Sequence, residues 1–186
     1  MWEFNFLLTE NNKIQRKSFF FLLRDIFILA ITWGLIFSNP QNLYLQYVLG
    51  IILGVCFYLA HEWSHFLGAF LGKSRIAVAE RLWSPFLFSF ESESNSIRQF
   101  IMMTAGGFLA TAVFLLLYFL FLPDTVWAKV AWNISLFLTF LTIFVEMPIA
   151  IWSLYKGEIF PVEIPLISEN RILVLLKKSF SRALRK

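Results

Sequence analysis

Residues 43–71 read LYLQYVLGIILGVCFYLAHEWSHFLGAFL, and this stretch decides how the chain folds. Almost all of it is apolar. As a helix that rises about 1.5 Å per residue, it is long enough to cross the roughly 30 Å hydrocarbon core of a bilayer. Its single carboxylate lies between two histidines in His61-Glu62-Trp63-Ser64-His65, which holds the only two histidines of the chain. The stretch therefore predicts a membrane-spanning helix that carries a polar site.

The arrangement of His61, Glu62 and His65 is the HExxH pattern of zinc sites. Residues four positions apart lie on one face of a helix, so both imidazoles can bind one metal ion. A glutamate next to the first histidine is placed to take a proton from a water that zinc activates. The spacing predicts His61 and His65 as ligands of Zn²⁺ and Glu62 as the catalytic base.

The composition of the whole chain indicates an all-α membrane protein. Apolar residues make up 59% of the 186 residues, charged residues make up 15%, and the mean hydropathy is +0.70. Soluble domains are much less apolar. The net charge of +4 does not indicate nucleic-acid binding, because the basic residues lie next to the apolar segments. The single cysteine, Cys56, excludes a disulfide framework and a cysteine-based zinc site.

Four apolar segments are predicted to cross the membrane as helices. They are Ser18–Phe37, Leu43–Leu71, Gln99–Leu122 and Trp127–Tyr155. We expect residues 1–17 to be a cytoplasmic N-terminal segment, residues 18–157 to form the transmembrane bundle, and residues 158–186 to form a cytoplasmic tail. The tail is predicted to be an amphipathic helix on the membrane surface, because its apolar side chains fall on one side and its basic ones elsewhere.

The basic residues predict how the chain is oriented. Of the 16 lysines and arginines, only Lys129, near the start of the fourth span, falls on the opposite side, and the others lie in or next to the N-terminal segment, the loop 72–98 and the tail. Cytoplasmic loops carry an excess of basic residues. We therefore expect a multi-pass protein of the cell membrane, with both termini and the loop 72–98 in the cytoplasm.

From residue 43 to residue 157 the chain resembles the site-2 protease family of intramembrane zinc metalloproteases. The resemblance rests on HEWSH at 61–65 and on Thr104-Ala105-Gly106-Gly107, which stands where the family carries an Ala-Gly-Pro type motif. Gly107 replaces the proline, and Ala110 stands where the family often has asparagine. The resemblance implies Zn²⁺ as cofactor, cleavage of peptide bonds inside the bilayer, and a membrane-spanning protein as substrate.

The family's third zinc ligand is an aspartate in an Asp-Gly motif, and the fourth span of this chain contains no aspartate. Glu146 is the favoured replacement, because it lies about 15 Å from the cytoplasmic end of its span, level with the histidines, and a carboxylate inside a membrane needs a partner. Pro148, two residues later, loosens the helix locally. Asp25 and Glu158 are alternatives, although an ion pair with the neighbouring Arg24 explains Asp25 more simply. A hydrogen bond of Glu146 to another polar group also stays open.

Gly106 and Gly107 allow two interpretations. They are predicted to lie at the depth of the metal, where they would let a substrate backbone approach closely and bind. Small residues also allow helices to pack tightly in lipid. Both interpretations predict contact with the span that carries the histidines.

The loop 72–98 contains two alternating stretches, around Ile76, Val78 and Glu80 and around Phe86, Phe88 and Phe90, separated by Ser84-Pro85. This pattern predicts a cytoplasmic β-hairpin. An exposed edge of such a hairpin can hold an unwound substrate. The alternative is an interfacial loop anchored by Trp83 and the phenylalanines.

The leading hypothesis is an intramembrane zinc metalloprotease that acts on a membrane-protein substrate. The lipid bilayer is the other expected partner, and no nucleic acid is expected to bind. The alternative is a non-proteolytic membrane scaffold or regulator that retains a zinc-binding core. A transporter is a distant third, because no internal repeat is visible. The sequence does not define the oligomeric state.

Overall fold

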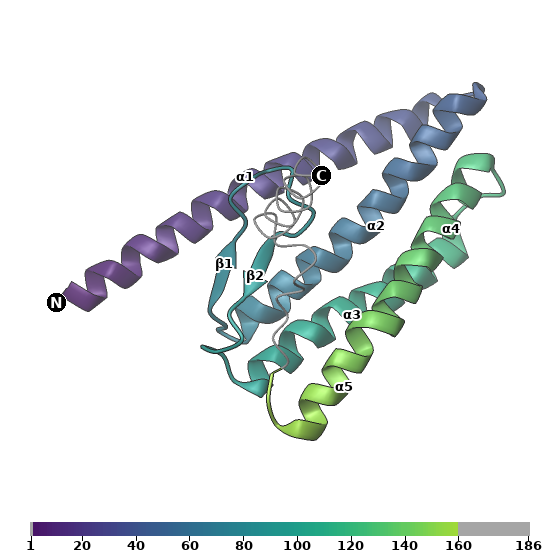
Figure 1. The fold of residues 1–186 in the computed structure, drawn as a ribbon. Helices are drawn as coiled ribbons and strands as arrows, with labels where there is room; N and C mark the ends of the chain where they lie inside the picture. Colours follow the sequence, from purple (N-terminus) through teal and green to yellow (C-terminus); the bar gives the residue numbers. More distant parts are fainter. Residues whose placement is uncertain (1, 160–186) are drawn as a thin grey trace, which may run out of the picture.

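The structure is a computed structural model that describes residues 2–159, with side chains described from residue 14 onward. It is mainly helical (Figure 1). The elements in chain order are α1 (Trp2–Ser38), α2 (Leu43–Leu71), β1 (Ile76–Val78), β2 (Phe88–Phe90), α3 (Ile97–Phe121), α4 (Val126–Leu141), the π-helix η1 (Thr142–Glu146) and α5 (Met147–Lys156). The amphipathic helix predicted for the tail lies outside the described residues.

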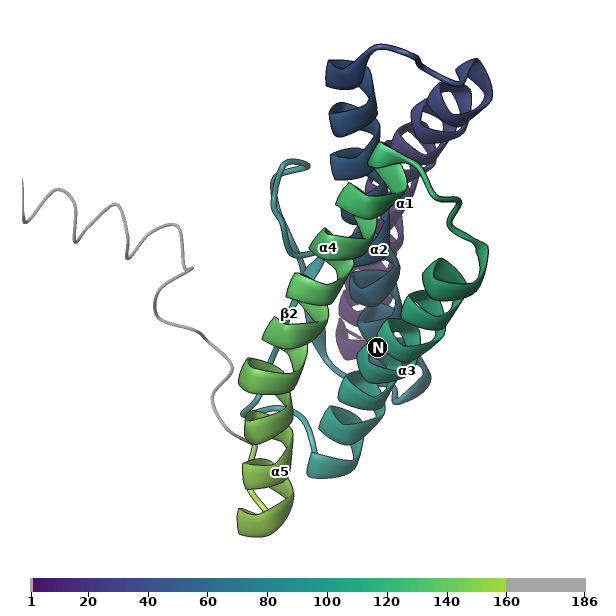
Figure 2. The ribbon, with the colours of Figure 1, turned by 90° about the vertical axis from the view of Figure 1, so that its right-hand side faces the viewer.

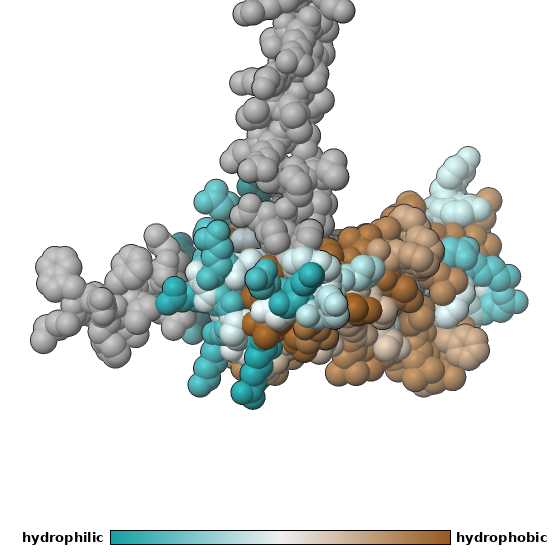
Figure 3. All heavy atoms as spheres, turned by 60° about the horizontal axis from the view of Figure 1, so that its bottom comes forward, coloured by the Kyte–Doolittle hydropathy of each residue, from teal (hydrophilic) through white to brown (hydrophobic). Residues whose placement is uncertain are grey.

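Four helical segments among the described residues are long and apolar enough to cross a membrane. They are Ile14–Ser38, Leu43–Leu71, Ile97–Phe121 and Val126–Lys156. Hydrophobic side chains cover the bundle on the face shown in Figure 3, between hydrophilic groups toward its two ends. The four predicted spans are therefore confirmed as long apolar helices, and the predicted limits of the second are the limits observed.

The helix ends follow the predicted breaks. The Asn42 side chain caps α2 by accepting from the amides of Tyr44 and Leu45. Ser96 and Gln99 form a capping box, so α3 begins at Ile97 rather than at the predicted Gln99. The difference is larger in α1, which extends back to Trp2, far before the predicted start at Ser18. Residues 2–17 contain no proline or glycine that would end a helix.

Helix α2 is the centre of the bundle and packs along both α3 and α4 (Figures 1 and 2). Its glycines allow the close approach. A Cβ atom at Gly54 would fall within 3.0 Å of the Ile134 side chain, and one at Gly68 within 3.0 Å of the Met102 and Met103 backbone. In lipid, helices associate through such close packing of small residues. The glycines thus set the distance between α2 and its neighbours.

The fourth apolar segment is interrupted at Thr142–Glu146, shortly before Pro148. The Met147 amide donates to the Thr142 carbonyl, five residues earlier, which makes one wide π-type turn. Proline has no N–H and its ring clashes with the carbonyl four residues earlier, here that of Phe144. The break places Pro148 near the start of α5, where a missing donor is tolerated. It also places Glu146 at the last position of the wide turn.

The predicted hairpin is present as a two-stranded antiparallel sheet beside α1 and α2 (Figure 1). Ile76 pairs with Phe90 and Val78 with Phe88. The strands are shorter than predicted, because Glu80 and Phe86 lie in the connection between them. Val78 and Leu87 are buried in a cluster with Phe21 of α1. The sheet is therefore packed onto the helices.

We predict that Gly68→Ala destabilises the bundle, because the added Cβ would meet the backbone of α3, which cannot move aside as a side chain could. Overpacking of this kind costs about 1–3 kcal/mol. Gly34→Ala is the matched control, because nothing lies within 4 Å of its added Cβ. Thermal unfolding of both variants in the same detergent checks this. Equal midpoints for the two variants would contradict the packing described above.

Candidate metal centre

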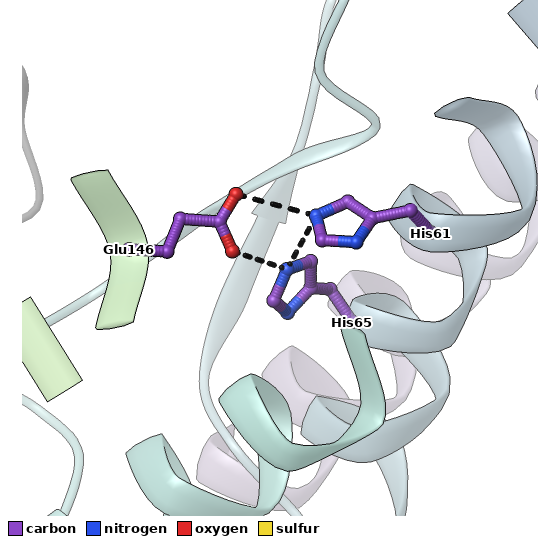
Figure 4. A group of neighbouring side chains, drawn as sticks. All are labelled: His61, His65 and Glu146. Atoms are coloured by element: carbon purple, nitrogen blue, oxygen red, sulfur yellow. Dashed lines mark hydrogen bonds and ion pairs between the residues drawn. The ribbon is translucent and has the colours of Figure 1, made fainter. Parts of the chain in front are cut away.

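Three side chains from two helical segments converge on one point (Figure 4). His61 and His65 lie one turn apart on α2, and their Nε2 atoms are 3.0 Å from each other. Glu146, from the π-helix, places Oε1 3.3 Å from His61 Nε2 and Oε2 3.3 Å from His65 Nε2. The carboxylate therefore faces both imidazoles at once, as the sequence predicted.

Helix α3 fixes the orientation of both rings through their other nitrogens. The His65 Nδ1 lies 2.9 Å from the Met103 carbonyl, and the His61 Nδ1 lies 3.2 Å from the Gly107 carbonyl and 2.8 Å from the Thr111 hydroxyl. A carbonyl can only accept, so each Nδ1 carries the proton. In a neutral ring this leaves Nε2 with the lone pair that can bind a metal ion.

With both rings neutral, two nitrogen lone pairs and a carboxylate face one another. Such a cluster of acceptors is satisfied by a cation among them, either a metal ion or a proton on one imidazole nitrogen. A tetrahedral ion with bonds of about 2.0–2.2 Å has ligand atoms about 3.3–3.6 Å apart, close to the observed spacings. Two histidines and one glutamate also form the ligand set of catalytic zinc sites that keep a fourth position open. The three residues therefore fit a metal ion.

The glycines of α3 bring its backbone to the imidazoles. A Cβ at Gly107 would fall within 3.0 Å of the His65 ring, and one at Gly106 would meet the Ser64 carbonyl. Both residues contact α2, as each interpretation of them predicted. The absence of a side chain at these two positions therefore lets α3 pack closely against α2 and leaves room for the His65 ring. Their role in substrate binding stays a prediction.

His61, His65 and Glu146 are called the metal group below, because together they could hold a metal ion. Glu62 is buried beside this group without belonging to it. Its carboxylate is close enough to interact electrostatically with both imidazoles. It also interacts electrostatically with the Leu87 backbone amide. The Tyr58 hydroxyl, one turn earlier on α2, donates to the Pro85 carbonyl of the hairpin connection at 2.9 Å. Glu62 therefore stands between the metal group and the end of the hairpin connection.

The alternative ligands lie elsewhere. The Asp25 carboxylate is buried in α1, where it accepts from Arg24 Nε at 2.6 Å and from Trp63 Nε1 at 2.7 Å. This confirms the ion-pair explanation. Glu158 is exposed beyond the left-handed Gly157 that ends α5. Neither residue belongs to the group that faces the histidines.

Sequence reasoning missed the residues that orient the histidines. Thr111 is one helical turn beyond Gly107, so the two share a face of α3, and this spacing could have identified it. The Met103 and Gly107 carbonyls carry no sequence signal, because every residue has one. Tyr58 lies one turn before Glu62 and could have been found by the same spacing.

Comparison with protein-family models, with curated proteins and with solved structures finds no match to this chain.

We predict that Thr111→Val lowers the affinity for Zn²⁺, used as a probe ion, by about ten-fold, the usual effect of removing a group that orients a histidine ligand. Thr104→Val is the matched control. Thr104 is also buried on α3, but its hydroxyl donates to the Phe100 carbonyl of its own helix. Competition titration with a zinc chelator measures both affinities. Equal affinities would show that Thr111 does not orient His61.

Proposed function

We propose that this chain is a multi-pass membrane protein and an intramembrane zinc metalloprotease. Four long apolar helices and their exposed hydrophobic side chains support the membrane placement. The distribution of lysines and arginines supports a cytoplasmic location of both termini and of the hairpin. In that orientation the HExxH motif lies in the cytoplasmic half of α2.

One observation carries the proposal. The HExxH helix and the π-helix bring two imidazole Nε2 atoms and one carboxylate to a single point. His61, His65 and Glu146 would hold Zn²⁺, because this set of two nitrogens and one oxygen suits zinc and leaves one position open. The resemblance to site-2 proteases in HEWSH and in Thr104-Ala105-Gly106-Gly107 points to the same chemistry.

When bound, zinc supplies an acidified water and stabilises the oxygen of the scissile carbonyl. Glu62 accepts the proton of the attacking water and delivers it to the leaving amine. The Met103 and Gly107 carbonyls and the Thr111 hydroxyl hold the two imidazoles in place during the reaction. These roles require no movement of α2 or α3.

Of the three proposed ligands, Glu146 is the most exposed. Its side chain is 36% exposed, whereas that of His61 is 6% exposed and that of His65 12% exposed. Water and substrate would approach from the side of the π-helix, because α3 covers the other ring nitrogens. We propose a membrane-spanning protein as the substrate, because the helices next to the exposed side of Glu146 are apolar.

A second candidate is a non-proteolytic membrane scaffold or regulator that keeps the zinc-binding core. The observations that favour it are the two departures from the resembled pattern, Gly107 for proline and Glu146 for aspartate. Glu62 disfavours it, because metal binding alone does not need a buried carboxylate beside the ligands. The two candidates differ in their predictions for a Glu62 variant: a protease would lose cleavage, whereas a scaffold has no cleavage to lose.

We predict about one zinc per chain in the purified protein and a strong loss of affinity in Glu146→Gln, which removes a charged ligand. Glu146→Asp should bind zinc with intermediate affinity, because it keeps a shorter carboxylate. Glu158→Gln is the control, because Glu158 is exposed and outside the group. Elemental analysis and chelator competition measure content and affinity. Unchanged zinc binding in Glu146→Gln would exclude Glu146 as a ligand.

We predict that Glu62→Gln retains zinc but no longer cleaves, because glutamine keeps the size of the side chain and cannot accept a proton. A drop in turnover of 10²-fold or more is expected, the order of a general base. A panel of single-span membrane reporters, co-reconstituted in liposomes, provides the substrates, and Glu80→Gln is the exposed control. A reporter cut equally by Glu62→Gln would remove Glu62 from the mechanism. No reporter cut by the wild type would favour the scaffold.

A further inference from the structure

The connection between β1 and β2 is mostly exposed, with Leu87 buried, and side chains of two helices hold its backbone. Leu82, Trp83 and Phe86 are exposed. Its backbone nevertheless has fixed partners. Arg24 of α1 donates through one guanidinium nitrogen to the Leu82 and Ser84 carbonyls. Tyr58 of α2 donates to the Pro85 carbonyl at 2.9 Å.

Arg24 is itself fixed by a buried carboxylate. Its Nε donates to Asp25 Oδ1 at 2.6 Å, and the other oxygen of Asp25 accepts from Trp63 Nε1 at 2.7 Å. The Asp25 side chain is only 5% exposed. A buried ion pair in an apolar helix is costly, and such pairs mark functional positions. This pair links α1, the HExxH helix and the hairpin connection.

The tethered connection reaches the face of α2 that carries Glu62. Tyr58, which holds Pro85, lies one turn before Glu62 on that face. Leu87 is buried in a cluster against which Trp63, the residue after Glu62, packs, and the Leu87 amide interacts electrostatically with the Glu62 carboxylate. The Ala79 amide donates to the Leu87 carbonyl at 2.9 Å. The segment 82–87 is therefore anchored by Arg24 at its first residue and packs beside Glu62 at its last.

We propose that Arg24 is a positioning residue: held by Asp25, it fixes the segment 82–87, together with Tyr58 at Pro85, so that the Leu87 amide orients the carboxylate of Glu62. The role in catalysis rests on the proposed function, whereas the tethering of the segment does not. Arg24 touches neither the metal group nor Glu62 and acts only through the segment.

Arg24→Lys tests the proposal. Lysine keeps the positive charge beside Asp25 but has no planar fork, so it cannot serve Asp25 and the two carbonyls together. Hydrogen–deuterium exchange of the full chain in lipid nanodiscs should become at least ten-fold faster in peptides covering 80–87, the size expected for lost hydrogen bonds to a charged group. Peptides of α2 and α3 should not change.

Two variants separate this role from general destabilisation. Trp63→Phe removes the indole donor but leaves Arg24, Asp25 and the carbonyls in place, so exchange in 80–87 should stay within about two-fold of the wild type. Arg98→Lys is the exposed control. Zinc content should stay the same in all variants. Unchanged exchange in Arg24→Lys, or an equal effect of Trp63→Phe, would overturn the proposal.

Kinetics on a reporter that the wild type cuts and Glu62→Gln does not cut supply the second measurement. Loss of orientation of the base should lower kcat by about ten-fold in Arg24→Lys and leave KM within two-fold. A higher kcat would overturn the proposal, because the segment would then be a barrier over the site. If the wild type cuts no reporter, the proposed function fails, and the exchange measurement alone decides whether Arg24 tethers the segment.

Discussion

The arrangement depends on one constraint: two imidazole nitrogens and a carboxylate meet inside an apolar bundle. With neutral imidazoles these groups are acceptors that repel one another, so a cation, either a metal ion or a proton, stabilises their meeting. The neighbouring helix holds the two imidazoles in place. Helix α3 fixes the two rings from behind through the Met103 and Gly107 carbonyls, and the glycines of α2 and α3 allow the approach that this requires.

Much of the fold and of the metal group could be predicted from the sequence. The limits of α2 follow from an unbroken apolar stretch between Asn42 and Gly72. Glu146 could be placed because a carboxylate in a membrane needs a partner at its own depth, and only the histidines were level with it. The ion pair between Asp25 and Arg24 could be predicted by the same reasoning, because the neighbouring guanidinium is the nearest partner available to the carboxylate.

Other features could not be predicted, because they depend on geometry that sequence spacing does not encode. Pro148 signalled a disturbance of the helix, but not whether it would be a kink or a wide turn. The contacts of Arg24 with Leu82 and Ser84 join positions far apart in the chain and involve backbone carbonyls, which every residue has. The length of α1 was missed because its polar N-terminal part does not look like a span, although nothing in it stops a helix.

The two sides of the metal group also differ mechanically. The histidines stand on an uninterrupted helix braced along its length by α3 and α4, so their spacing is stiff. The carboxylate stands at the end of a wide turn followed by a proline, where the backbone ladder is weakest and a helix bends most easily. A small bend there would move the oxygens of Glu146 relative to two stationary nitrogens. The group of His61, His65 and Glu146 is thus rigid in its nitrogens and compliant in its oxygens, so the carboxylate can shift relative to the imidazoles without disturbing the rest of the bundle.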